Sequence, residues 1–314
     1  MIKWALLTAA AAAGAFAGSG AAQAANPAPT VAYVRGGAIY VTSGGTETRL
    51  TEDEVNSRPK FSPDGRRIAY VHNSTIWVMN ADGSGKRQVS DRSAGGPSWS
   101  PDGASIAFSA LSCTGGPGVY RVSSTQIAPA PQVLFPAECK GQPLPEVATI
   151  SSVEDVPAGS AGSLTERLGA DQTVAWSPDG TKIAFPGGEC DDIADACLTV
   201  GTVATGAEHA IDVYGGGGSE ASGFGVVPAW SPDGTKVAWT AYTQDATPIH
   251  VEEADASGAN RHAVGTAQDR ELVFANRGTA VLTATTKGRS TITVLNLTTG
   301  KRTALRTGSQ PTVA

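Results

Sequence analysis

The stretch Trp99-Ser100-Pro101-Asp102-Gly103 is one of four copies of an aromatic-Ser-Pro-Asp-Gly motif, and this motif decides the fold. The other copies begin at Phe61, Trp176 and Trp230. In each copy, proline presets φ for the second position of a tight turn, aspartate bonds the nearby backbone, and glycine takes the positive φ that closes a hairpin. Each copy therefore predicts a β-strand that ends near the aromatic residue, a tight turn and a returning strand.

The sequence on either side of the motif repeats as well. In each copy, two residues follow the glycine and then a short apolar run begins, as in Ile106-Ala107-Phe108. The first two copies start at Phe61 and Trp99, 38 residues apart, which gives room for four short strands. A period of about forty residues with four strands per unit is typical of a β-propeller. A fifth and degenerate unit begins at Glu271-Leu272-Val273-Phe274.

The two ends of the chain complete one further unit. Val31 to Leu50 is expected to hold two short strands, a Gly44-Gly45 turn and then Thr48-Arg49-Leu50, which is three-quarters of a blade without its innermost strand. Residues Gln310 to Val313 have the pattern of an innermost strand and no unit of their own, so the ends are expected to share one blade and close the ring. Innermost strands are thus expected at six residues: Phe61, Trp99, Trp176, Trp230, Phe274 and Val313.

The sequence therefore predicts an all-β fold, a six-bladed β-propeller of four-stranded antiparallel blades. An alternative of seven blades stays open at this point. Trp99 and Trp176 are 77 residues apart, which is nearly two periods, so a degenerate blade would fit between them. In the six-bladed interpretation, residues at about 136–171 form an insertion that is mostly a long loop.

The repeat resembles that of the TolB-like β-propeller family. The motif residues quoted above carry the resemblance, which covers nearly the whole mature chain. It implies the propeller fold, but it says less about function, because the family includes translocation and cell-envelope proteins, protein-binding modules and propeller domains attached to peptidases. TolB itself has an additional N-terminal α/β domain, which is not expected here because the first predicted strand begins at Val31.

The N-terminal segment predicts export. Lys3 precedes a short apolar run, and Ala22-Gln23-Ala24 is a small-residue cleavage site, so residues 1–24 are interpreted as a secretory signal peptide. Residues 25–30 would then be a flexible lead-in, and residues 31–314 a single propeller domain. Glycines interrupt the apolar run, so no membrane span is expected in the mature chain. We expect a secreted or periplasmic monomer.

Charge and cysteine content narrow the classes of partner and compartment. The formal net charge is −6 and no basic run stands out, which argues against nucleic acid as a partner. Four cysteines in an exported protein imply two disulfides, with three possible pairings. Cys190 and Cys197 enclose a short loop. Cys113 and Cys139 lie on connections that leave a blade on the same face, so we expect the pairs Cys113–Cys139 and Cys190–Cys197.

The loop around the second cysteine pair carries the candidate metal ligands, which are Glu189, Asp191, Asp192 and Asp195. Carboxylate oxygens are the ligands that Ca²⁺ prefers, and a disulfide reduces the cost of ordering a loop on binding. The hypothesis is that this loop binds Ca²⁺ or docks a basic partner. The spacing does not match an EF-hand, and a solvated acidic loop is the simpler interpretation. No other cofactor is expected.

No catalytic motif is visible elsewhere. The motif aspartates are interpreted as turn residues, and the motif aromatics as packing between blades rather than a stacking platform for a sugar or a peptide. The four histidines are scattered, and there is no zinc-protease, nucleophile-elbow or phosphate-loop pattern.

The sequence therefore favours a non-enzymatic binding or scaffold propeller that recognises a protein, a peptide or a cell-envelope component. The predicted long connections all leave the blades on one face, where binding residues usually lie. The alternative is an extracellular lyase or hydrolase with its active site on that same face.

Overall fold

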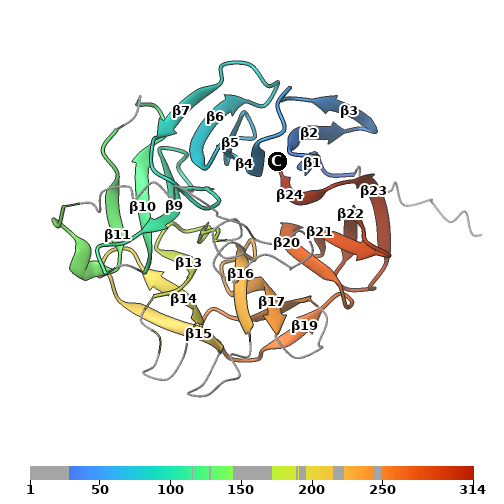
Figure 1. The fold of residues 1–314 in the computed structure, drawn as a ribbon. Helices are drawn as coiled ribbons and strands as arrows, with labels where there is room; N and C mark the ends of the chain where they lie inside the picture. The colour runs from blue at the N-terminus through green and yellow to red at the C-terminus, as the bar shows by residue number, and fades with distance from the viewer. Residues whose placement is uncertain are drawn as a thin grey trace, which may run out of the picture.

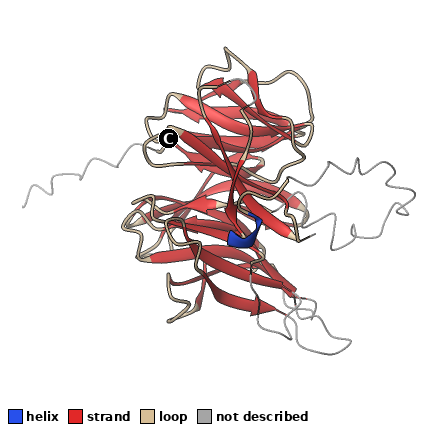
Figure 2. Cartoon of the chain, turned by 90° about the vertical axis from the view of Figure 1, so that its left-hand side faces the viewer, coloured by secondary structure: helices blue, strands red, loops and turns tan. Residues whose placement is uncertain are grey.

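The computed structural model describes residues 28–114, 116–126, 129–143, 172–188, 190, 196–214, 223–243 and 249–314. These residues form six four-stranded antiparallel sheets, arranged as blades around a central axis (Figure 1). The fold is the all-β six-bladed propeller that the motif spacing predicts. Within the described ranges the only helical element is a short 3₁₀ helix, η1 (Ala137–Cys139), drawn blue in Figure 2.

The blades are numbered here from the N-terminus, each from its innermost strand outward. Blade 1 contains β24 (Ser309–Val313), β1 (Val31–Arg35), β2 (Ala38–Ser43) and β3 (Thr46–Arg49). Blade 2 contains β4 (Asn56–Phe61), β5 (Arg67–His72), β6 (Thr75–Asn80) and β7 (Arg87–Ser90). Blade 3 contains β8 (Ser98–Trp99), β9 (Ser105–Leu111), β10 (Pro117–Ser123) and β11 (Gln132–Phe135).

The other three blades follow the same order. Blade 4 contains β12 (Ala175–Trp176), β13 (Lys182–Pro186), β14 (Ala196–Thr202) and β15 (Glu208–Tyr214). Blade 5 contains β16 (Gly223–Trp230), β17 (Lys236–Thr243), β18 (His250–Asp255) and β19 (His262–Val264). Blade 6 contains β20 (Asp269–Asn276), β21 (Thr279–Thr286), β22 (Arg289–Asn296) and β23 (Arg302–Thr307).

The Ser-Pro-Asp-Gly motifs form the turns between first and second strands. In blade 2, the hydroxyl of Ser62 donates to Asp64 Oδ1 at 2.6 Å, and the same oxygen accepts the backbone N–H of Arg66 at 3.1 Å. These contacts, the Ser62 hydroxyl above all, hold the pKa of Asp64 below its usual range. Gly65 closes the turn with φ +67°. The same contacts recur at Asp102, Asp179 and Asp233.

The hydrophobic core is divided among the junctions between blades. Among the described residues, six buried clusters each span two neighbouring blades, one at each of the six junctions, and a small seventh cluster lies within blade 5. Between blades 3 and 4, Phe135 stacks on Phe185 with ring centroids 5.2 Å apart. The backbone N–H of Trp176 also donates to Ser98 Oγ across that junction at 3.0 Å. Blades 3 and 4 therefore pack directly on each other, and the alternative of a seventh blade between them is wrong.

The ring closes through the C-terminal strand, as expected. β24 pairs with β1 in antiparallel register, with Val31 opposite Val313, so the first and last strands lie side by side in Figure 1. Gly308 makes the entry into β24 possible. Its φ is +148°, and a Cβ atom there would lie 2.6 Å from a ring carbon of Tyr33 and 2.7 Å from the carbonyl oxygen of Val34.

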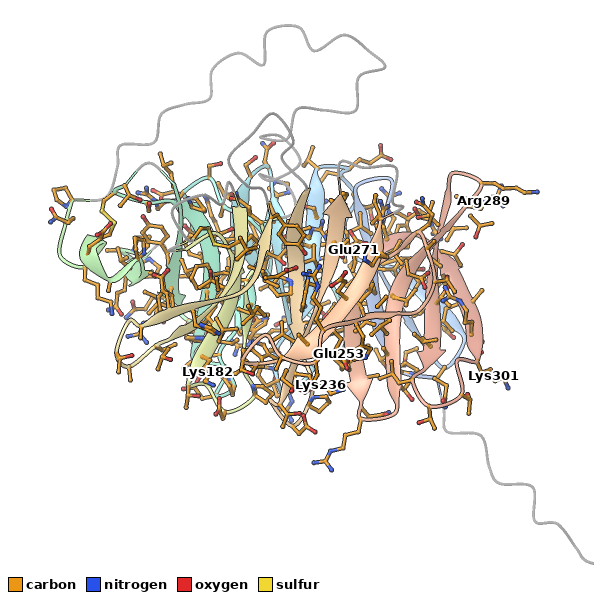
Figure 3. All side chains as sticks on the ribbon, turned by 90° about the horizontal axis from the view of Figure 1, so that it is seen from below. Lys182, Lys236, Glu253, Glu271, Arg289 and Lys301 are labelled. Atoms are coloured by element: carbon orange, nitrogen blue, oxygen red, sulfur yellow. A yellow bond between two sulfur atoms is a disulfide. The ribbon has the colours of Figure 1, made fainter. Side chains whose placement is uncertain are left out.

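The connections define two faces of the ring. We call the face with the Ser-Pro-Asp-Gly turns and the turns between third and fourth strands the turn face, and the opposite face the loop face. Figure 3 views the ring edge-on, with Arg289 at the start of β22 at the upper edge and Lys301 of the β22–β23 turn at the lower edge. Glu271 lies toward the loop face. Lys182, Lys236 and Glu253 lie, like Lys301, toward the turn face.

Candidate functional site

Two disulfides tie connections of the loop face to the blades. Cys113, which follows β9, is bonded to Cys139 of η1, and Cys190 is bonded to Cys197 of β14. This pairing is the one expected from the sequence. Both bridges restrict the chain where it leaves the rigid sheets, which lowers the entropic cost of ordering these connections around a partner.

The proposed calcium ligands Glu189, Asp191, Asp192 and Asp195 lie outside the described residues. Calcium binding by this loop therefore stays a prediction. Among the residues that the structure does describe, no group of three or more His, Cys, Asp or Glu side chains is arranged to hold a metal ion.

Large exposed apolar side chains are restricted to the loop face in the described part of the chain. They are Val55, Leu111 and Val213, with exposed fractions of 50%, 45% and 41%. Val55 immediately precedes β4, which starts at the loop face, whereas Leu111 and Val213 lie at the loop-face ends of β9 and β15. A single exposed apolar residue is ordinary on a protein surface. Their restriction to one face is the distribution expected of a contact surface.

The connection between blades 1 and 2 adds a fixed acidic feature to the same face. Residues 52–54, Glu-Asp-Glu, are all exposed. The buried amide of Asn56 holds the connection in place, because its Nδ2 donates to the carbonyl oxygen of Gly37 and to Thr51 Oγ1, both at 3.1 Å. The acidic residues are therefore presented by an ordered turn.

A buried ion pair lies where innermost strands of three blades meet, and its residues are not among the sites predicted from the sequence. Arg58 of β4 donates through Nη1 to Glu271 Oε1 at 2.9 Å, and their side chains are only 5% and 8% exposed. Gln310 of β24 joins the two. Its Oε1 accepts the backbone N–H of Arg58, and its own backbone N–H donates to Glu271 Oε2, both at 2.7 Å.

The carboxylate in this cluster is charged and fully bonded. Burial raises the pKa of Glu271, but the positive charges of Arg58 and Arg270 and the hydroxyl of Thr283, which donates at 2.7 Å, bring it below its usual range. Both carboxylate oxygens have donors, so the group is not a free acid or base. The arrangement is suited to holding three blades in register.

A signal for this cluster was present in the sequence. Arg58, Glu271 and Gln310 each stand three residues before the innermost-strand residues Phe61, Phe274 and Val313. All three have positive φ, between 53° and 58°, because each lies at an irregularity in strand pairing. When the repeats are aligned at this position, Arg58 and Glu271 occupy equivalent points of the ring, one with a positive and one with a negative charge.

Lys60 is a second polar group on the innermost strand of blade 2. Its backbone carbonyl accepts Trp99 Nε1 at 3.0 Å, but its amine has no hydrogen bond or ion pair within the described ranges. The side chain keeps some solvent contact although protein surrounds it. Desolvation lowers the pKa of Lys60 to about 8, and the neighbouring charge of Arg58 acts in the same direction.

A further polar cluster joins blades 4 and 5. The guanidinium of Arg261 contacts the carboxylates of Asp212 and Glu252, and it lies over the rings of Tyr214 and Trp239 at 5.8 Å from each centroid. Burial raises the pKa of Asp212. This effect outweighs the hydroxyl of Tyr214 and the charge of Arg261, which lower that pKa. The cluster bridges two blades by charge and cation–π contact.

Comparison with known proteins supports the fold. No protein-family model matches the chain, and no curated protein matches it. Among solved structures, TolB from Acinetobacter baumannii has 18% sequence identity and a TM-score of 0.64; the match covers 90% of this chain and 66% of that chain. The chain thus spans slightly less than two thirds of that protein's length.

Two further solved structures match over most of their own length. A putative TolB from Agrobacterium tumefaciens has 14% identity and a TM-score of 0.60, with 91% of this chain and 92% of that chain covered. A nidogen/laminin complex matches with 10% identity and a TM-score of 0.59, covering 91% of this chain and 98% of that chain. At such identities the likeness shows the six-bladed propeller fold, similar to the propellers of TolB. No helix in the described residues is long and apolar enough to cross a membrane.

Proposed function

We propose that this chain is an exported, non-enzymatic binding propeller that recognises a protein, a peptide or a cell-envelope component through its loop face. One observation carries the proposal: the loop face bears both disulfides and all the large exposed apolar side chains of the described residues. A rigid scaffold that presents anchored connections on one side is the usual basis of a recognition surface.

Export is part of the same proposal. Residues 1–24 would be the signal peptide, residues 25–30 a flexible lead-in, and residues 31–314 the mature propeller, with an insertion at about 136–171. Disulfides persist in oxidising compartments and are rare in the cytoplasm, so the two bridges support a periplasmic or secreted location. We propose that the mature protein is a monomer in solution.

Two further points favour binding over catalysis. The buried charges of Arg58 and Glu271 neutralise each other, and both oxygens of Glu271 already accept hydrogen bonds. One similar solved structure is a nidogen/laminin complex, in which the propeller fold occurs in a complex of proteins.

The loop face is tested by a matched pair of surface variants. Val55→Ser/Leu111→Ser/Val213→Ser changes exposed residues of the loop face, and Lys86→Ser/Lys301→Ser changes exposed residues of the turn face. Affinity capture from an envelope extract should recover a partner with the intact protein and the turn-face variant, and lose it with the loop-face variant. Loss of the same partner only with the turn-face variant would place recognition on the wrong face for this proposal.

We also propose that the acidic loop binds a calcium ion or a basic partner on this face. Calorimetric titration with Ca²⁺ should release heat with the intact protein, and much less with Asp191→Asn/Asp192→Asn. If no heat is released and Ca²⁺ does not raise the melting temperature, the metal is removed from the proposal. Affinity capture with the same variant then tests the basic partner.

A further inference from the structure

A cleft of about 590 Å³ lies between blades 5 and 6 and opens on the turn face, opposite the surface discussed above. One wall is formed by β17, β18 and β19, and the other by β20 and β22 with the turns that follow them. Figure 3 shows two of its lining residues, Lys236 and Glu253, near the edge that carries the turns. A volume of this size is within the range of small-ligand sites.

The cleft is found where the repeat departs from its pattern. Blade 6 has Phe274 in place of tryptophan and Asn276-Arg277-Gly278 in place of Pro-Asp-Gly. At the junction of blades 2 and 3, Trp99 fills the corresponding space, bonds the carbonyl oxygen of Lys60 at 3.0 Å and carries the guanidinium of Arg67 4.5 Å from its ring centroid. Phenylalanine is smaller and has no N–H group, and Phe274, unlike the buried Phe61 at the equivalent position of blade 2, is only partly buried and lines the cleft.

A buried carboxylate in the cleft has an unused oxygen. The side chain of Glu253 is only 8% exposed. Its Oε1 accepts Lys236 Nζ at 2.6 Å and lies 3.6 Å from His262 Nε2. Its Oε2 has no hydrogen-bond partner among the described residues. This oxygen is not one of the fully buried, unbonded atoms of the described residues, so it faces the open cleft and can accept a hydrogen bond from a ligand hydroxyl or N–H group.

The rest of the lining combines donors with an apolar surface. Lys236 uses one N–H on Glu253 and remains 44% exposed, and Arg277 at the mouth is 81% exposed. Phe274 and Leu295 supply apolar surface. A fitting ligand must therefore present donors and acceptors on neighbouring atoms, with an apolar face beside them.

We propose that this cleft binds a sugar residue of a glycan. A sugar hydroxyl both donates and accepts, so one group can donate to Glu253 Oε2 while it accepts from Lys236, and both bonds are charge-assisted. The C–H face of the pyranose ring would lie against Phe274. A phosphate dianion would be repelled by Glu253 and Asp233 and would leave Oε2 without a donor. A simple cation would meet Lys236, Arg277 and Arg302 beside these two carboxylates, and it would leave the apolar wall unused.

The test uses the full mature protein on an array of immobilised mono- to tetrasaccharides, followed by calorimetric titration of the strongest hit. Glu253→Gln and Phe274→Ala should each weaken binding about tenfold or more, since a charge-assisted bond or the apolar platform is lost. The matched control is Lys182→Ala, because Lys182 begins β13 of blade 4 as Lys236 begins β17 of blade 5. That variant should bind as the intact protein does.

Circular dichroism and melting curves establish that each variant is folded. If Glu253→Gln does not fold, Arg277→Ala and Phe274→Leu replace it, since Arg277 is largely exposed and the leucine remains apolar. Arg277→Ala should then weaken binding severalfold. The proposal is overturned if no saccharide binds, or if a saccharide binds with the same affinity to every folded cleft variant.

Discussion

Arg58 Nη1 lies 2.9 Å from Glu271 Oε1, although 213 residues separate them in the chain, and Gln310 bonds both residues from the strand between them. These three residues belong to blades 2, 6 and 1, so the strand that closes the ring is held from both sides. The pair is buried and both oxygens of Glu271 have donors, so its main consequence is for the stability of the closed ring.

Removing one partner of this pair should be costly. Glu271→Gln leaves the buried guanidinium of Arg58 without its counter-charge, and loss of one partner of a buried pair typically costs about 3–5 kcal/mol. Urea unfolding at neutral pH measures the effect. The control is Glu47→Gln, because the pair Arg35–Glu47 is 36% and 26% exposed and should contribute only up to about 1 kcal/mol. Equal losses in the two variants would contradict the assignment.

The same carboxylate predicts a pH dependence. The pKa of Glu271 is lowered in the folded state from an ordinary value of 4.5, so its contribution to stability is present above pH 4.5. It is lost as pH falls from there through the folded-state pKa. The difference in unfolding free energy between the intact protein and Glu271→Gln should therefore be constant from pH 7 to 5 and shrink at lower pH. A difference that grew on acidification would show the opposite shift.

Deletion of residues 309–314 should open the ring. It removes β24, its pairing with β1 and the two bonds of Gln310, and it exposes the inner edge of blade 1. We expect a large fall in melting temperature, with Gln310→Ala intermediate because the strand itself remains. A truncated protein that melts like the intact one would show that β24 does not close the ring.

The two disulfides should differ in their contribution to stability. Cys113–Cys139 closes a loop with a sequence separation of 26, and Cys190–Cys197 one of 7. In the loop-entropy view each contributes about 2–4 kcal/mol, and the longer loop more. Denaturant unfolding of the two double Cys→Ser variants tests this order. A larger loss from removing Cys190–Cys197 would mean that native-state contacts outweigh loop length.

The fold could be predicted because its signals are local. Turn chemistry places a hairpin at every Ser-Pro-Asp-Gly motif, and the fragment around Gln310 is complete only when it is joined to Val31. The pair Cys113–Cys139 followed from the face on which two blade connections emerge, and the pair Cys190–Cys197 from the short loop between the two cysteines. None of these steps needs the position of a side chain in space.

The polar groups near the axis required the three-dimensional structure. Whether Arg58 meets Glu271 depends on how three blades surround the axis, and isolated charges in a strand are more often solvated. The cleft at Phe274 shows a different limit. Its sequence signal, the missing tryptophan and the altered turn, was interpreted only as degeneration of the repeat, since volume between blades is not encoded in any one strand.

Replacing Lys60 with an apolar residue should make the protein more stable. Its folded-state pKa is about 8, below the ordinary 10.5, so the folded state loses the proton more readily than the unfolded state. Burying the charged amine thus opposes folding at neutral pH, and stability should rise between about pH 8 and 10.5 as the unfolded chain alone retains the proton. Lys60→Met should gain about 1–3 kcal/mol at pH 7, from a shift of this size at 1.36 kcal/mol per pH unit and partial solvent contact. Urea unfolding from pH 7 to 10 should show this gain shrinking with pH, whereas Lys301→Met at an exposed turn should show none. A gain that stays constant over this range would contradict a lowered pKa at Lys60.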